Sequence, residues 1–513
     1  MYNNKVTLCI ILFMGLLCSC SLYMNWELLG FENAEVFGHV WSQSWRFQDW
    51  PNGLLGTDQT IGTTKFPLID PIPTLLVNLF SLLVTLSSAY NLLFVSSLVL
   101  SAWVMRFIPV GTTEDPSVEM PLMVLMLTSP IVWGSLNSGL TEDWGLFLPM
   151  LAIISLRKNQ TVQAGVWTAV SAYWGLVLGW MSAVIVSVYA VVHLKSKREL
   201  FKLWFVMGVC VTPLICLHWD RLWIEGHRSL APPSHFEPMW VLNPWHHTDL
   251  ASLFWIGPVD FSAQVIRLHP ASLGLAAIVS SFGCRDWKWW GMFLLCVGFS
   301  LGPEVYWMGY PTGIQNPAHW ILTAIPGSSL LNHHGRWMLM GVICWIVIVV
   351  QGMQRFKIVH WMTPIIALEW FLCTPLGMPI MGTKPVKTSV VLNQMTEMDI
   401  PEATRLLRIP IRGPEVVFQQ SLYEQTIHGL PLWMNPNRPN PSEWFRLTES
   451  SQWIETIAFT KELPNDACIP EVAGAVLVAE PYIELFVDSW GSPIIQDDSY
   501  ALWTAAPRCL ATR

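Results

Sequence analysis

The chain has 513 residues, of which 52% are hydrophobic and 12% are charged. Because soluble domains usually carry about 25% charged residues, this composition excludes an ordinary soluble protein and indicates that a lipid bilayer surrounds much of the chain. The net charge of -8 and the lack of a basic block exclude a nucleic-acid partner. Thirty tryptophans agree with a membrane protein, since the indole ring favours the headgroup layer.

Apolar runs along the chain predict an α-helical polytopic membrane protein. A helix needs about 20 apolar residues to cross the hydrocarbon core, and the runs predict about eleven transmembrane helices. The runs cover residues 6–24, 90–108, 119–135, 144–156, 160–174, 176–194, 201–218, 271–285, 288–303, 337–353 and 358–374. The first run follows Lys5 and is interpreted as an uncleaved anchor; the alternatives are a signal peptide and a lipoprotein cleaved before Cys20.

Lysine and arginine are distributed unevenly between the connections, and this predicts the orientation. An N-terminus in the cytoplasm satisfies the positive-inside rule, because most cations then lie in short cytoplasmic turns. These cations are Lys5, Arg106, Arg157, Lys158, Lys195, Lys197, Arg198, Arg285, Lys288, Arg355 and Lys357. The apolar run 71–88 is interpreted as an interfacial or re-entrant helix on the outer side, because a span there would invert every later loop.

The predicted protein therefore lies in the plasma (inner) membrane and has two parts. Residues 1–380 form the transmembrane bundle, and residues 381–513 form a small soluble α/β domain on the extracytoplasmic side. The long outer loops of the bundle cover residues 25–89, 218–270 and 304–336.

The first outer loop carries acidic candidates for catalysis. If residues 32–41 are helical, then Glu32, Glu35 and His39 fall on one face. Two carboxylates and an imidazole can act as a general base or bind a divalent cation such as Mg²⁺ or Mn²⁺. Asp58 is a third acidic candidate in this loop. A solvated helix face is the alternative that the pattern leaves open.

Later outer segments hold further candidate side chains. Glu142 and Asp143 stand just before a predicted span, where they either contact a substrate or cap the helix. Arg336, preceded by His333 and His334, either snorkels to the membrane surface or binds a lipid-linked phosphate through its planar guanidinium. The histidines of the long second outer loop lack the tight spacing of a zinc site, which argues against zinc.

The composition changes near residue 385 to that of a soluble domain. The patterns predict strands over 406–410 and 475–479 and near 494 and 501, and helices over 416–428, 452–459 and 482–490. Such alternation is typical of a small α/β unit. Gln425 and His428 either line the membrane site from above or belong to a structural helix end. Cys468 and Cys509 can pair if the domain lies in an oxidising compartment.

The order of these elements and several fragments resemble bacterial polytopic membrane proteins of the GT-C glycosyltransferase superfamily. The fragments are Trp50–Gly53, Phe66–Pro71, Ala89–Leu92, His333–Arg336 and Tyr423–Pro431. The resemblance covers most of the chain and implies transfer of a sugar from a polyprenyl-phosphate-linked donor to an acceptor at the outer membrane face. It also implies an acidic base in the first outer loop, although the spacing of the acids here differs from the Asp, or Asp/Glu pair, usual in the family.

In this interpretation, the catalytic carboxylate that acts as the base is Glu35, Glu32 or Asp58. Arg336 holds the donor phosphate. The remaining substrate-binding candidates are His39, Glu142, Asp143, His333, His334, Gln425 and His428. A non-catalytic transport or envelope-assembly protein is the alternative function. Apart from Glu369 the predicted spans contain almost no ionisable residues, which favours a site at the interface over a translocation path.

Overall fold

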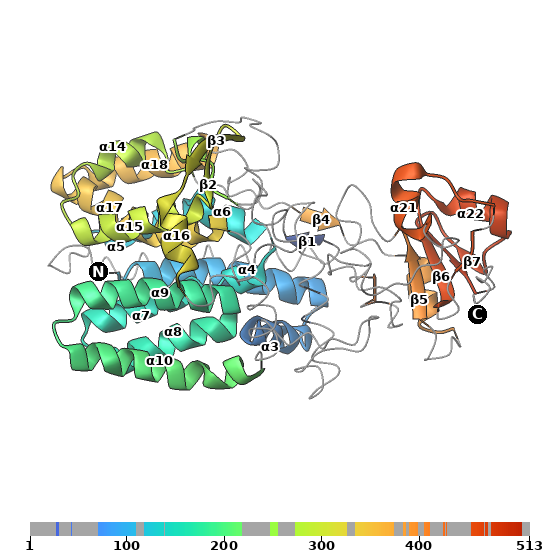
Figure 1. Cartoon of the computed structure of the whole chain (residues 1–513), viewed down its shortest axis with the longest axis horizontal. Coiled ribbons are helices and arrows are strands. Elements are labelled where there is room, and N and C mark those ends of the chain that lie inside the picture. Colours follow the sequence, from blue (N-terminus) through green and yellow to red (C-terminus); the bar gives the residue numbers. More distant parts are fainter. Residues whose placement is uncertain are drawn as a thin grey trace.

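The chain forms a helical bundle and a small sheet with helices, shown at the left and right of Figure 1. The computed structural model describes residues 27–29, 40, 43, 70–108, 117–137, 139–217, 247–254, 272–325, 334–373, 383–385, 389–398, 405–410, 424–425, 427, 453–465, 467–469 and 473–504. The predicted first span, 6–24, and the predicted domain boundary near residue 381 lie outside these residues.

The bundle helices coincide with the apolar runs predicted between residues 90 and 374. They are α4 (Leu86–Met105), α5 (Glu119–Thr128), α6 (Pro130–Asn137), α7 (Phe147–Arg157), α8 (Thr161–Trp174), α9 (Leu176–His193), α10 (Lys197–Leu217), α14 (Leu275–Ser281), α15 (Trp287–Ser300), α17 (Trp337–Arg355) and α18 (Val359–Cys373). Their buried apolar side chains form one continuous core cluster. The sequence pattern thus predicted where the helices of the bundle lie.

Helix lengths within the described residues support fewer complete crossings than predicted. Four helical segments are long and apolar enough to span a membrane by themselves: α4, α9, α10 and the segment His334–Arg355 that contains α17. A fifth is added if α5 and α6, which meet at an angle of 48°, form one span. The total of about eleven crossings therefore stays a prediction.

The run 119–135 is not the single straight helix that was predicted. Pro130 begins α6, and the preceding Ser129 adopts an extended backbone with ψ 122°. A proline has no N–H to donate and disfavours the helical conformation of the residue before it, so the chain bends at this point.

A short helix precedes the first described long one. Helix α3 (Pro71–Ser81) has 11 residues and exposes Leu75 and Leu79 while it buries Val77. Eleven residues rise about 16 Å, which is too short to cross the bilayer core. This agrees with the expectation of a non-crossing apolar helix at the start of the run 71–88.

Helix α14 corrects the span predicted over 271–285. It has seven residues, about 10 Å of helix, and follows an extended segment that ends at Gly274 with φ +76°. The carbonyl of Leu273 accepts hydrogen bonds from two indole N–H groups, those of Trp345 and Trp370. The Glu369 carboxylate accepts the N–H groups of the first two helical residues. These contacts satisfy the polar backbone where the helix is interrupted.

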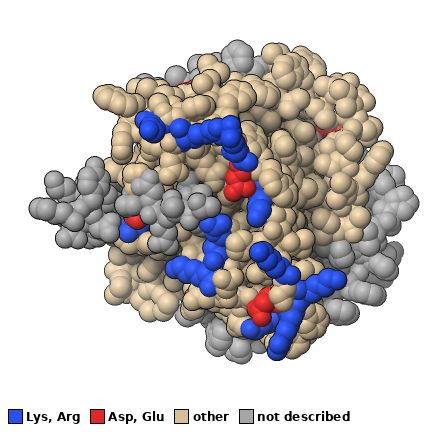
Figure 2. All heavy atoms as spheres, turned by 90° about the vertical axis from the view of Figure 1, so that its left-hand side faces the viewer, with Lys and Arg blue, Asp and Glu red and all other residues tan. Residues whose placement is uncertain are grey.

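The two ends of the bundle differ in charge. Figure 2 shows lysines and arginines gathered on the end that lies at the left of Figure 1. They come from the last turns of α7 and α17, the α9–α10 turn and the α14–α15 turn. At the opposite end β1 (Glu27–Leu29) pairs antiparallel with β4 (Thr383–Pro385) and contacts α4. Segments after the first and last predicted spans therefore meet at one end, as the predicted topology requires.

The C-terminal part is an α/β unit built on a four-stranded sheet. The sheet has the order β5 (Arg405–Ile409), β6 (Ala473–Ala479), β8 (Tyr500–Trp503), β7 (Ile495–Gln496), with β5 and β6 parallel and the other pairs antiparallel. Alternate residues of the strands face α21 (Trp453–Thr460) and α22 (Ile483–Trp490) on one side and α19 (Val390–Met395) on the other. The predicted strands and the helices over 452–459 and 482–490 are confirmed.

Candidate functional site

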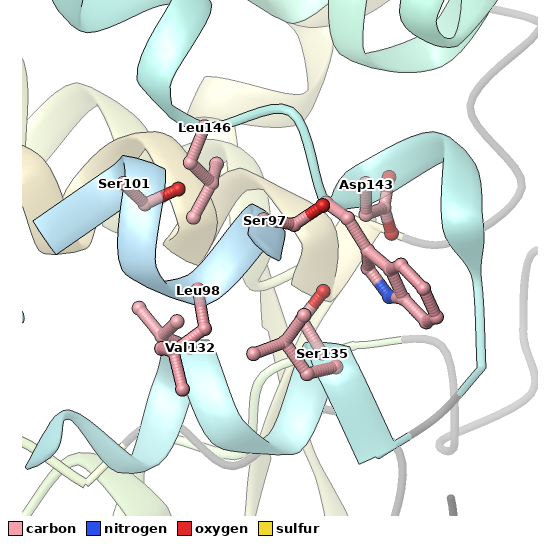
Figure 3. Close-up of a pocket in the computed structure, with 9 residues that line it drawn as sticks. Ser97, Leu98, Ser101, Val132, Ser135, Asp143 and Leu146 are labelled. Carbon is pink, nitrogen blue, oxygen red and sulfur yellow. The ribbon is translucent and has the colours of Figure 1, made fainter. Parts of the chain in front are cut away.

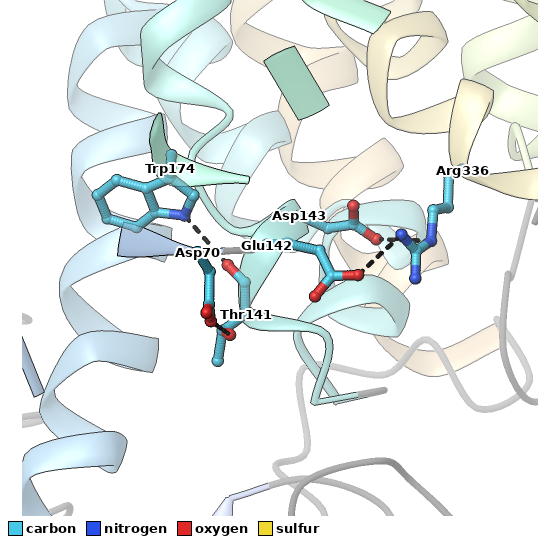
Figure 4. A network of polar contacts seen from close by, with 6 residues as sticks. All are labelled: Asp70, Thr141, Glu142, Asp143, Trp174 and Arg336. Carbon is cyan, nitrogen blue, oxygen red and sulfur yellow. Dashed lines mark hydrogen bonds and ion pairs between the residues drawn. The ribbon is translucent and has the colours of Figure 1, made fainter. Parts of the chain in front are cut away.

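A buried group of charged side chains lies at the end of the bundle opposite the cationic end. Arg336 Nη1 lies 3.0 Å from Glu142 Oε1, and Arg336 Nε lies 3.3 Å from Asp143 Oδ2 (Figure 4). The side chains of Arg336 and Asp143 are 6% and 1% exposed, and that of Glu142 is 10% exposed. We call these three residues the acid–arginine cluster.

Local backbone structure places the two acids. Gly139, with φ +78°, follows α6 and turns the chain, as a glycine in the left-handed conformation commonly does after a helix. The chain then forms a single 3-10 turn, η2 (Thr141–Asp143), before α7 begins. A side chain at Gly175, between α8 and α9, would collide with the backbone of Glu142, so this junction packs directly on η2.

These contacts argue against one of the two interpretations that the sequence left open for each residue. Glu142 and Asp143 do not cap α7, whose N-cap residue is Leu146 and which has no side-chain cap. Arg336 does not snorkel to the surface, because its side chain is buried against both acids. The capping and snorkelling interpretations are therefore wrong for these residues.

A second polar group adjoins the cluster through Thr141. The Thr141 hydroxyl donates to Asp70 Oδ2 at 2.8 Å and accepts from Gln43 Nε2 at 2.9 Å. The Thr141 carbonyl accepts from Trp174 Nε1 at 3.1 Å, and Figure 4 shows Asp70, Thr141 and Trp174 beside the cluster. Asp70, Gln43 and Thr141 are fully buried. Their hydrogen bonds tie the end of the first outer loop to η2.

Three imidazoles form a group around His334, two residues before Arg336. The ring of His334 lies 5.0 Å from that of His247 and 5.4 Å from that of His319, measured between centroids. Tyr306 stacks on His247 with a centroid separation of 6.0 Å. Burial lowers the pKa of His319, which favours its neutral form. A neutral imidazole can donate one hydrogen bond and accept another.

A small cavity lies directly under Asp143. It measures about 10 Å³, which is roughly the room for one water molecule. Its lining includes Ser97 and Ser101 from α4 and Ser135 from α6, together with Asp143 (Figure 3). The interior next to the acid–arginine cluster is therefore lined by hydroxyl groups together with apolar side chains.

The structure brings four of the predicted site residues together: Glu142, Asp143, His334 and Arg336. Gln425 is buried, and its neighbour Ile427 packs against both the bundle core and the core of the C-terminal sheet. The other predicted candidates lie outside the described residues: Glu32, Glu35, His39, Asp58, His333 and His428.

Glu424 explains part of the fragment around Gln425. Its carboxylate forms a bidentate ion pair with Arg408, at 3.0 and 3.1 Å, and accepts a hydrogen bond from the Tyr500 hydroxyl at 2.6 Å. All three residues are buried in the C-terminal unit. This glutamate therefore has a structural role, which favours the helix-end interpretation for its part of the fragment.

Sequence reasoning did not select several residues that the structure places at the site. Asp70 precedes Pro71 at the start of α3, a position where an acidic side chain ordinarily caps the helix. The Asp70 side chain makes no capping hydrogen bond. Its side chain contacts residues 27 and 71 positions away in sequence, Gln43 and Thr141. The histidine-rich second outer loop was a signal for His247, although its spacing pointed to no specific ligand.

A divalent cation does not fit the described part of the site. No group of three or more His, Cys, Asp or Glu side chains suited to a metal ion occurs among the residues that the structure describes. Glu142 and Asp143 face a guanidinium, which repels a metal ion. The metal-binding prediction for Glu32 and Glu35 concerns residues outside this part.

The structure is similar to crystal structures of ArnT from Cupriavidus metallidurans. The likeness to the apo state has a TM-score of 0.46 with 12% sequence identity and covers 98% of each chain. The likeness to ArnT bound to undecaprenyl phosphate has a TM-score of 0.39 with 12% identity and covers 97% of this chain and 98% of that chain. No protein-family model and no curated protein matches the sequence.

Proposed function

We propose that the protein is a membrane glycosyltransferase that moves a sugar from a polyprenyl-phosphate-linked donor to an acceptor at the extracytoplasmic face. The observation that carries this proposal is the burial of Arg336 against Glu142 and Asp143 at the end of the bundle opposite the cationic end. A planar guanidinium matches the oxygens of a phosphate as well as those of a carboxylate. Arg336 is therefore the proposed binding group for the donor phosphate.

A phosphate oxygen can displace Glu142 from Arg336 more readily than it can displace Asp143. Asp143 is almost fully enclosed, whereas Glu142 keeps 10% of its side chain exposed. When a phosphate oxygen takes the place of Glu142 on Arg336, Asp143 continues to hold the guanidinium in position. The displaced Glu142 carboxylate is then released beside the reacting centre, where it can orient a hydroxyl or accept a proton.

The proposed reaction is a single displacement with inversion at the sugar. The acceptor oxygen forms a bond to the anomeric carbon while the bond from that carbon to the phosphate oxygen breaks. The acceptor proton passes to a carboxylate, and polyprenyl phosphate leaves with the electron pair of the broken bond. Arg336 stabilises the charge that develops on the leaving phosphate. The bases implied by the resemblance remain Glu35, Glu32 and Asp58. Among the described residues, Glu142 is the candidate for the carboxylate that accepts this proton.

Two features support the proposed extracytoplasmic placement of the site. Lysines and arginines gather at the other end of the bundle, and such residues favour the cytoplasmic side. Cys468 in the C-terminal unit is disulfide-bonded, and disulfides persist in oxidising compartments outside the cytoplasm. Cys509, its predicted partner, lies outside the described residues. Both features support an N-terminus inside and a C-terminal unit outside.

Binding of a polyprenyl phosphate to the purified protein tests the role of Arg336. Arg336→Lys keeps the positive charge but loses the planar fork, and we expect it to weaken binding at least about tenfold. Arg106→Lys is the matched control, because Arg106 pairs with Glu119 at 3.4 Å near the cationic end. Unchanged binding by Arg336→Lys, or an equal loss in both variants, would contradict the proposal. Transfer is then followed by mass spectrometry of envelope glycolipids from cells that express Glu142→Gln.

One observation favours a transporter as the second candidate function. Interrupted helices with an acidic residue beside the break are common in transporters, and α14 with Glu369 has this form. Against this, both oxygens of Glu369 already accept backbone N–H groups, so the carboxylate acts as a structural cap. Transport of a lipid-linked substrate by a protein that transfers no sugar would decide for this alternative.

A further inference from the structure

A hairpin with a single charged residue, Glu304, follows α15 at the site end of the bundle. Strand β2 (Glu304–Trp307) pairs antiparallel with β3 (Tyr310–Gln315) through a two-residue turn. The turn residues Met308 and Gly309 both have positive φ, at 52° and 83°, which is the conformation that closes tight hairpins. No Asp, Glu, Lys or Arg occurs from residue 305 to residue 335. We call residues 304–315 the aromatic hairpin.

Hydrogen bonds hold the aromatic hairpin firmly against the bundle. The Asp249 carboxylate accepts the N–H groups of both turn residues, Met308 and Gly309, at 3.1 and 2.6 Å. Asn316, at the end of β3, donates to the carbonyls of Gly298 and Gly302, each at 2.7 Å. The hairpin is therefore a rigid extension of α15 and keeps one orientation.

The two faces of the aromatic hairpin are different. Tyr306 faces inward, is 8% exposed and stacks on His247. Trp307, Tyr310 and Ile314 are 44%, 75% and 61% exposed. The neighbouring helix α16 (Pro317–Thr323) adds Trp320, which is 66% exposed. Several large apolar side chains exposed on one hydrogen-bonded hairpin and the helix that follows it mark a surface that contacts something other than water.

The position and chemistry of this patch identify its partner. The hairpin starts four residues after α15 ends at Ser300, and Phe299 in the last turn of α15 contacts Trp337 at the start of α17. The hairpin therefore lies near the end of a helical segment that is long and apolar enough to span a membrane. Tryptophan and tyrosine favour the headgroup layer, where the ring is buried and its polar atom stays hydrated. The outer edges of a two-stranded hairpin need water for their N–H and C=O groups, which excludes the hydrocarbon interior. From this we propose that the aromatic hairpin inserts into the phospholipid headgroup layer of the outer leaflet.

This surface brings lipid next to the histidine group. Because Tyr306 and Trp307 are adjacent on β2 and face opposite ways, one short strand joins the headgroup layer to His247. The inference concerns the location of the hairpin and holds whether or not the protein transfers a sugar.

Depth measurements with nitroxide labels test this placement in full-length protein. A label attached through p-acetylphenylalanine avoids the native cysteines, and nanodiscs of phosphatidylethanolamine and phosphatidylglycerol supply the bilayer. The label replaces Ile314, which is 61% exposed. Two similarly exposed residues serve as controls: Val209 on the lipid-facing α10, at 55%, and Ile494 in the C-terminal unit, at 54%. Collisions with oxygen, which dissolves in lipid, are compared with collisions with a water-soluble nickel chelate.

We expect the label at 314 to collide with oxygen more often, relative to the nickel chelate, than the label at 494. The ratio of oxygen collisions to nickel-chelate collisions at 314 should stay below the ratio at 209, because the headgroup layer is shallower than the hydrocarbon core. A ratio equal to that at 494 would show that the hairpin stands in water and would overturn the inference. A label at Tyr310, which is 75% exposed, repeats the measurement if the protein labelled at 314 does not fold.

Discussion

Replacing Arg336 by methionine removes the guanidinium from the acid–arginine cluster while keeping most of the side-chain volume. The guanidinium contacts Glu142 at 3.0 Å and Asp143 at 3.3 Å, and all three side chains are at least nine-tenths enclosed. Taking away one partner of a buried ion pair leaves the other charge in a medium that solvates it poorly, at a cost of about 3–5 kcal/mol. We therefore expect Arg336→Met to lose about 3–5 kcal/mol of stability.

A matched substitution at the cationic end separates this effect from the loss of any arginine. Arg106 lies 3.4 Å from Glu119, which is 29% exposed, and stands over the rings of Trp103 and Phe107. A partly solvated ion pair is worth about 0–1 kcal/mol and a cation–π contact about 0.5–1 kcal/mol. With one ion pair and two such ring contacts, Arg106→Met should therefore cost about 1–3 kcal/mol, centred on about half the loss at Arg336.

Neutralising the acids together with Arg336 tests the physical cause. In the triple variant Arg336→Met, Glu142→Gln, Asp143→Asn, no charge of this cluster is left buried, so much of the lost stability should return. The assay is thermal unfolding of the full-length protein in detergent, followed by the intrinsic fluorescence of its 30 tryptophans. The reasoning is refuted if the triple variant melts no higher than Arg336→Met. It is also refuted if Arg336→Met melts at the same temperature as Arg106→Met.

Two further outcomes follow from local geometry. Gly302→Ala should destabilise the protein by about 1–3 kcal/mol more than Gly313→Ala. Both glycines have a positive φ, but only at Gly302 does an added methyl group collide with the ring of His247. Equal melting temperatures of the two variants would contradict this. Burial tends to raise the pKa of Asp497, but hydrogen bonds from Ser389 and three backbone N–H groups outweigh it and lower this pKa below 3.8. The C-terminal unit should therefore keep this contribution to its stability above about pH 4 and lose it as the pH falls further, so cleavage by pepsin should rise below pH 4 in the native protein. Asp497→Asn should weaken this pH dependence, and an unchanged pepsin profile would exclude the contribution.

Much of the fold was predictable because a bilayer demands long apolar helices. Hydropathy located the helices between residues 90 and 374, and short apolar runs located the strands of the C-terminal sheet. Hydropathy did not reveal the two interruptions. At Pro130 the bend follows from a missing N–H group, and at Gly274 it depends on Glu369 from α18, which lies 93 to 94 positions from the N–H groups it accepts.

The candidate site was predictable only in part. Glu142, Asp143, His334 and Arg336 stood out because polar residues are rare near apolar runs and the positive-inside rule assigns their loops to one face. Asp70 did not stand out, since an acid before a proline and a helix has an ordinary local explanation. Its hydrogen bonds to Gln43 and Thr141 cross long stretches of chain and have no local signal.

By itself, the sequence determined that the chain enters a membrane, where most of its helices lie and which connections share a face. These properties depend on the transfer of each segment between water and lipid, which is a sum over neighbouring residues. Only the tertiary structure decided that Arg336 meets Glu142, 194 positions away, instead of the membrane surface. An ion pair of this kind depends on atoms within about 4 Å of each other. Helix packing brings such atoms together, and neither the spacing nor the composition of the chain records the result.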